Sequence, residues 1–173
     1  MLAGLDLRPP ADRVGRVLFA IAVAAALLAS ALVLLLALMT ALNVPLKQIG
    51  LQPLRGEFEL VDLGVATAVF AFLPLAQFER GYVIVDLVTQ RAPERVKALL
   101  DAAAGIVFAV SMAVVAWRMF LGGVDIAQTG EQTQILHLKY WWSFAVAVPS
   151  LVLLAAVCVY TSWTDWRKAG VLR

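Results

Sequence analysis

The sequence predicts an all-α integral membrane protein with four transmembrane helices. Hydrophobic residues make up 62% of the 173 residues, charged residues 15%, and the mean hydropathy is +0.88. Soluble domains usually contain about 45–50% apolar and about 25% charged residues. At roughly 20 apolar residues per crossing, the chain has room for about four or five spans and no separate extramembrane domain. We therefore expect one membrane domain over 1–173. The period-two alternation of a β-barrel is absent from the sequence.

The first two spans follow from charge-free intervals and from helix-start signals. The first is expected at 17–42, inside the uncharged interval between Arg16 and Lys47. This interval is much longer than the roughly 7–15 apolar residues of a signal peptide. The second span is expected at 60–78, after acidic residues that suit a helix N-terminus, and it contains Pro74.

The third and fourth spans are bounded by glycines and by aromatic residues. The third is expected at 98–121, ending at the Gly122–Gly123 pair, with Arg118 near its end where a long side chain can reach the interface. The fourth is expected at 141–163 and contains Pro149. Tryptophans bracket it as interfacial belts do: Trp141, Trp142, Trp163 and Trp166.

Basic residues are distributed unevenly between the two sides of the predicted membrane. Ten of the 14 Lys and Arg lie in the N-terminal segment, the loop between spans two and three, and the C-terminal segment. The other two loops hold four. Because cytoplasmic loops carry the excess of Lys and Arg, both termini are predicted to be cytoplasmic.

The scarcity of reactive side chains excludes several classes of protein. One Cys and one His leave no disulfide, no Cys-rich metal site and no bis-His haem site, and the composition excludes a nucleic-acid binder. The deep parts of the spans are expected to lack ionisable groups, and no catalytic constellation is visible. We expect neither an enzyme nor a bound cofactor. A self-contained small transporter acting as an oligomer stays open as an alternative, although few polar residues could face a shared pore.

Small residues recur at the spacing that lets helices approach closely. The pairs are Ala22 and Ala26, Gly64 and Ala68, and Gly105 and Ala109. They are predicted to be contact faces, either within the chain or with another protein.

The loop 78–101 holds the most distinctive sequence. Four apolar residues can share one helical face: Val83, Ile84, Leu87 and Val88. This pattern predicts a short amphipathic helix in the membrane interface, the alternative being a polar connector. Pro93 suits the first turn of the following helix.

This loop and the segments after it resemble the small membrane subunit, of the DctQ type, of tripartite ATP-independent periplasmic (TRAP) transporters. The family pattern of an Arg-x-Gly-His-Ile-x-Val-Asp-like stretch is matched by Arg80 and Gly81 through Asp86, and Pro93 follows in the step toward the third span. The family's Gly-rich outer loop corresponds to Gly130 and Glu131. Its aromatic entry to the fourth span corresponds to Trp141 and Trp142, and the proline within that span to Pro149. Tyr82 replaces a common histidine, and Lys139 a common proline.

The resemblance implies an accessory role in the bacterial inner (cytoplasmic) membrane. The partners would be a large (M-type) permease subunit and a periplasmic (P-type) substrate-binding protein that delivers an organic acid. Sodium and substrate would bind the large subunit, and this chain would brace that subunit in the lipid. Interface candidates are Arg80, Gly81, Asp86, Pro93, Trp141, Trp142 and Pro149; candidates for docking the binding protein are Asp125, Glu131 and Lys139.

Overall fold

The computed structural model describes residues 12–49, 56–78 and 94–171 of the chain. These residues form four helices: α1 (Arg13–Gln48), α2 (Glu57–Phe78), α4 (Glu94–Thr129) and α5 (Trp141–Val171). Each contains a segment long and apolar enough to cross a membrane. The predicted all-α class, with four helices long and apolar enough to cross a membrane, is confirmed for these residues, which contain no strand.

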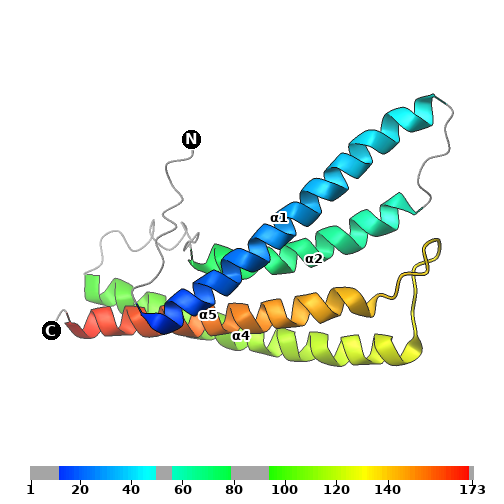
Figure 1. Cartoon of the computed structure of the whole chain (residues 1–173). Coiled ribbons are helices and arrows are strands. Elements are labelled where there is room, and N and C mark those ends of the chain that lie inside the picture. Colours follow the sequence, from blue (N-terminus) through cyan, green and yellow to red (C-terminus); the bar gives the residue numbers. More distant parts are fainter. Residues whose placement is uncertain (1–11, 50–55, 79–93, 172–173) are drawn as a thin grey trace.

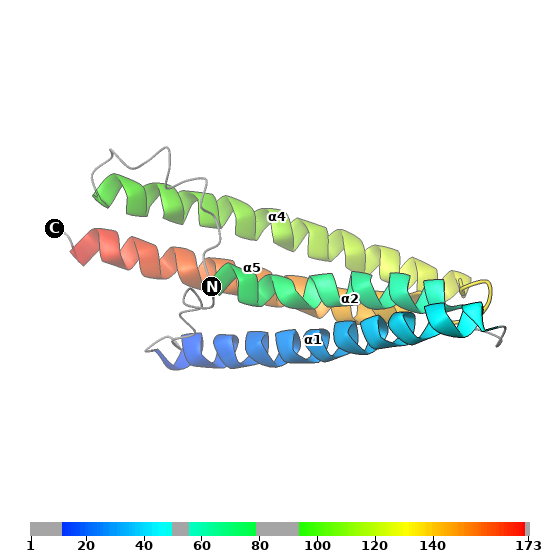
Figure 2. The ribbon, with the colours of Figure 1, turned by 90° about the horizontal axis from the view of Figure 1, so that it is seen from above.

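The four helices lie side by side in the order α4, α5, α2, α1 (Figures 1 and 2). The helix α5 packs against both α4 and α2, and α1 packs mainly against α2. Figure 2 places α4 and α1 at the two edges of this row, and Figure 1 shows α1 inclined away from the α4–α5 pair toward its C-terminal end. The arrangement is therefore an open row rather than a bundle closed around one core.

The contact between α1 and α2 follows a seven-residue repeat. The buried residues of α1 at this spacing are Gly15, Ala22, Ala29, Leu36 and Asn43. A strict heptad keeps one seam of a helix facing its neighbour. Leu36 lies against Gly64 of α2, where an added Cβ would come within 2.5 Å of the Leu36 side chain. Ala68 of α2 is buried beside Ala29.

The contact between α4 and α5 is built in the same way. Its α4 residues are small or flexible and alternate by three and four positions: Ala102, Gly105, Ala109, Met112, Ala116, Met119 and Gly123. On α5 the facing core includes Leu151, Leu154 and Cys158, all almost fully buried. The three predicted pairs of small residues thus lie at helix contacts within the chain.

The expected end of the third span at Gly122–Gly123 is wrong. The helix α4 continues through both glycines to Thr129, and Gly130 follows with a φ of +69°. Gly123 has a packing role instead, since a Cβ there would lie 2.9 Å from the Cβ of Phe144. A glycine inside a membrane helix allows close approach without ending the helix.

Several predictions concern residues that the structure does not describe. The interfacial helix was expected within 78–101, and four of the interface candidates belong to this region: Arg80, Gly81, Asp86 and Pro93. All four lie outside the described residues.

Candidate functional site

The end of the row that holds the start of α2 and residues 130–140 is called here the loop end. There Asn43, at the last heptad position of α1, is 2% exposed and donates a hydrogen bond from its side-chain amide to the Glu57 carboxylate. The ammonium group of Lys47 lies 3.6 Å from the same carboxylate. These contacts fix the end of α1 to the beginning of α2.

Glu59, in the first turn of α2, holds the α4–α5 connection. Its two carboxylate oxygens accept hydrogen bonds from the backbone N–H groups of Ile135 (2.8 Å) and Leu136 (2.9 Å). The side chain of Leu136 lies directly on Gly56, which has a φ of +86°. A segment 76 residues further along the chain is thereby anchored on the first turn of α2.

The connection itself is an ordered turn. The backbone N–H of Thr133 donates to the carbonyl of Leu138 and the buried Thr133 hydroxyl accepts from the N–H of Leu138, both at 2.9 Å. Gln132 and Lys139 pair as an isolated antiparallel bridge. His137 occupies the left-handed region with a φ of 52° and is exposed.

The three docking candidates surround this turn, and all are exposed. Asp125 lies in the last turns of α4. Glu131 accepts a backbone hydrogen bond from Tyr140 at 3.3 Å, and Lys139 belongs to the bridge with Gln132. The structure thus brings the three side chains to the loop end, where Glu59 holds the backbone of Ile135 and Leu136.

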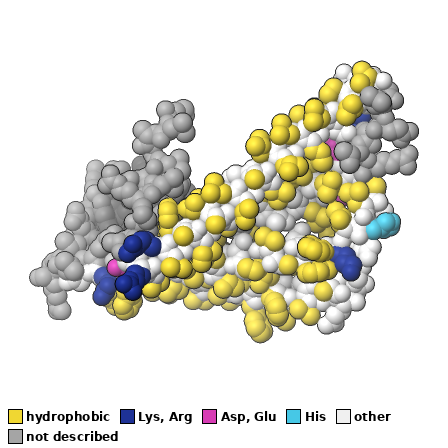
Figure 3. Space-filling model, in the orientation of Figure 1, with side chains coloured by type: hydrophobic (Ala, Val, Ile, Leu, Met, Phe, Trp, Pro, Cys, Tyr) yellow, Lys and Arg dark blue, Asp and Glu magenta, His cyan; other side chains and the backbone are white. Residues whose placement is uncertain are grey.

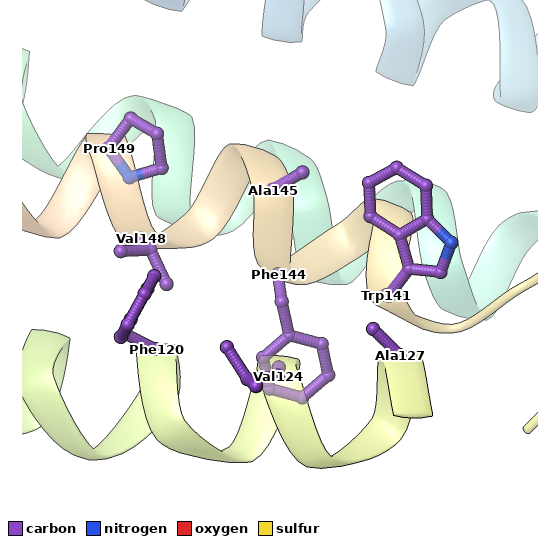
Figure 4. A pocket seen from close by; sticks show the side chains of 9 residues that line it. Phe120, Val124, Ala127, Trp141, Phe144, Ala145, Val148 and Pro149 are labelled. Carbon is purple, nitrogen blue, oxygen red and sulfur yellow. The ribbon is translucent and has the colours of Figure 1, made fainter. Parts of the chain in front are cut away.

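An apolar groove of about 320 Å³ lies between the end of α4 and the start of α5 (Figure 4). It is lined by Phe120, Gly123, Val124, Ala127, Trp141, Phe144, Ala145, Val148 and Pro149. Two interface candidates, Trp141 and Pro149, therefore share one groove, and Trp142 stacks on Trp141 with ring centroids 5.1 Å apart. The groove suits an acyl chain or an apolar side chain, because a charged ligand would lose its hydration without finding partners.

The opposite end of the row, called here the basic end, carries Arg13, Arg16 and Arg167. The Arg167 guanidinium lies 5.9 Å from the ring centroid of Trp163. Figure 3 shows Lys and Arg side chains grouped where α1 begins, with hydrophobic side chains over the middle of the molecule. Charge is thus concentrated at the two ends.

Arg118 departs from this distribution. It was expected near the end of the third span, but α4 continues eleven residues beyond it, and its side chain is exposed. Arg118 therefore lies well inside a helix long enough to cross a membrane, and not near its end as expected. Among the described residues, no three His, Cys, Asp or Glu side chains are placed to share a metal ion.

These features define a multi-pass membrane protein whose helices pack through small residues and whose charges gather at the ends. The family described as "Tripartite ATP-independent periplasmic transporters, DctQ component" matches residues 36–168. The chain belongs to this family, a transporter component family and not an enzyme family, and the resemblance found in the motifs is confirmed. No curated protein and no solved structure matches the chain.

Sequence reasoning did not find Gly56 and Thr133, and it found Glu59 only as an acidic helix start. The signal at Glu59 was its place in the first turn of α2, but its partner is a distant backbone segment that no spacing rule connects to it. Thr133 is one of several polar residues in a loop. Arg118 was placed near the end of the third span. Its position well inside the helix could have been predicted, because no helix-stop residue other than glycine lies between Leu121 and Thr129.

Proposed function

We propose that this chain is the small accessory permease subunit of a sodium-coupled TRAP transporter that takes up organic acids. The observation that carries the proposal is the family match over 36–168, on helices that pack through alanine and glycine. Such contacts suit a bracing role better than a polar substrate pathway. The large M-type subunit would hold sodium and substrate, and a P-type binding protein would deliver the substrate.

The orientation belongs to the same proposal. Both termini lie in the cytoplasm, the basic end faces inward, and the loop end faces the periplasm of a bacterial inner membrane. The charge bias between the ends supports this orientation. The exposed Asp125, Glu131 and Lys139 then help to dock the binding protein. The interfacial helix expected from the sequence around Asp86, which lies outside the described residues, would be on the cytoplasmic side in this orientation.

Reconstitution in proteoliposomes tests the proposal. The chain, its large permease subunit and the binding protein are expected to take up an organic acid when sodium is present, and to lose uptake when choline replaces sodium. The chain alone should give no uptake. Sodium-driven uptake by the chain alone would overturn the accessory role and favour the small oligomeric transporter.

The docking role has a separate readout within the same preparation. Combined substitution Glu131→Ala and Lys139→Ala is expected to raise the concentration of binding protein needed for half-maximal uptake, while maximal uptake with saturating binding protein is kept. The matched control is Gln128→Ala, an exposed neutral position on the last turn of α4. Equal behaviour of the two variants would remove docking from the proposed role of these side chains.

A further inference from the structure

The side of α4 that faces away from α5 carries a second regular stripe. Its apolar residues alternate by three and four positions and are all exposed: Val107, Val110, Val114, Trp117 and Leu121. Trp117 is 64% exposed. Since α4 is an edge helix of the row, no described helix of this chain covers the stripe. A three-and-four repeat fits packing against another helix.

Arg118 lies beside this stripe, deep in the membrane-crossing part of α4. It precedes the end of α4 at Thr129 by roughly 16 Å of helix. Two close approaches fix the register of α4 against α5: Gly123 meets Phe144, and Gly105 meets Ser162. In this register Arg118 is about level with Pro149. That level is about 11 Å from the Trp141–Trp142 pair and about 21 Å from Trp163.

The position of Arg118 makes escape to water difficult. The Cα–Cβ bond of a helical residue tilts toward the helix N-terminus, and for α4 this direction leads away from the nearer, loop end. Among the described residues, none forms an ion pair or hydrogen bond with its guanidinium. Ionisable residues at such depth normally pair with another protein group.

The other edge helix provides the contrast. Between Arg16 and Lys47, α1 has no charged residue, and its exposed side is mainly an aliphatic surface that suits lipid. Each edge helix exposes one serine whose hydroxyl bonds its own backbone, Ser30 on α1 and Ser111 on α4, so the exposed side of α4 differs by its guanidinium. A carboxylate is the partner that best compensates a guanidinium away from water.

We propose that the face of α4 formed by Val107, Val114, Arg118 and Leu121, called here the Arg118 face, binds a transmembrane helix of the large permease subunit. A carboxylate on that helix pairs with Arg118 within the bilayer. The inference rests on the proposed function and names the surface through which the chain braces its partner. A second copy of this chain fits poorly, because a two-fold dimer through this face would set Arg118 opposite Arg118 at equal depth.

The first test is recovery of the complex after co-expression. Arg118→Leu is expected to lower co-purification of the large subunit about tenfold or more, and Arg118→Lys less, because only the charge is kept. Arg13→Leu, which removes one positive charge from an exposed position at the basic end, is the matched control and should leave recovery unchanged. Folding is checked by the melting temperature of the chain alone, which Arg118→Leu should leave equal or higher since the position faces lipid there.

The second test locates the face. A benzophenone photocrosslinker at position 114 or 121 should form an adduct with the large subunit, whereas the same group at Leu27 or Leu34, exposed on α1, should not. Unchanged recovery with Arg118→Leu, crosslinks from α1 alone, or adducts between two copies of this chain would overturn the inference. Failure of the unsubstituted chain to co-purify with the large subunit would instead overturn the proposed function.

Discussion

Gly56 combines two demands that other residues meet poorly. Its φ is +86°, and a Cβ would lie 2.5 Å from the Cγ of Leu136. We expect Gly56→Ala to lower the free energy of unfolding by roughly 1–3 kcal/mol, because the left-handed backbone costs roughly 1–2 kcal/mol and the displaced leucine adds to it. Thermal unfolding in detergent measures the loss.

Gly130 separates the two contributions. It shares the positive φ, at +69°, but no neighbouring side chain lies within 4 Å of the Cβ position. Gly130→Ala should therefore cost only the backbone part. A loss at Gly130 equal to the loss at Gly56 would show that Leu136 contributes nothing to the requirement for glycine.

Glu59 is expected to control the order of the α4–α5 connection. Glu59→Gln replaces a carboxylate that accepts two backbone hydrogen bonds by an amide with one acceptor oxygen. Amide exchange at Ile135 and Leu136 should become severalfold faster, as measured by hydrogen–deuterium exchange with mass spectrometry. Glu131→Gln removes the same charge from an exposed side chain and should leave exchange at both amides unchanged. Unaltered exchange in Glu59→Gln would assign the order of the turn to Thr133 instead.

At the scale of the helices, the contact between Gly105 and Ser162 offers a double-mutant cycle. A Cβ on Gly105 would lie 2.1 Å from the Ser162 hydroxyl oxygen but 3.4 Å from its Cβ. Gly105→Ala alone is expected to cost about 1–2 kcal/mol through overpacking. Ser162→Ala removes the oxygen. In the double variant most of the stability lost through Gly105→Ala should therefore be regained, which gives a favourable coupling energy between the two positions. Thermal unfolding of the four variants in detergent measures this coupling energy. If the effects of the two substitutions on stability were simply additive, the two helices would be free to separate at this contact.

The existence and type of the helices could be predicted, but their ends and pairings could not. Charge-free intervals identify each span, because charge is costly in lipid. The end of α4 was misplaced because glycine acts both as a helix stop and as a packing residue, and Gly123 is the second kind. The pairs Gly64–Ala68 and Gly105–Ala109 signalled close contacts, but small residues do not identify the neighbouring helix.

At the scale of the whole molecule, the open row is the feature that sequence patterns could not predict. In water the burial of apolar surface would favour closing the row, whereas lipid solvates an exposed aliphatic face as well as a neighbouring helix does. Hydrophobic periodicity therefore cannot distinguish the covered Ala109 from the uncovered Val107. The edge surfaces of α1 and α4 are both apolar, and the single charge at Arg118 is what distinguishes them.

Orientation in the membrane can be tested with the full chain because it has one cysteine, Cys158, which is buried in the core. In a Cys158→Ala background, Gln134→Cys at the loop end and Gly170→Cys at the basic end change no Lys or Arg, so the topology signal is kept. Both positions are exposed. The cells are treated so that the outer membrane is permeable and the inner membrane is intact. A membrane-impermeant maleimide should then label position 134, and it should label position 170 only after the inner membrane is opened. This is expected because the excess of Lys and Arg keeps the basic end in the cytoplasm. The reverse pattern would place both termini in the periplasm, and the turn held by Glu59 could then not contact a periplasmic binding protein.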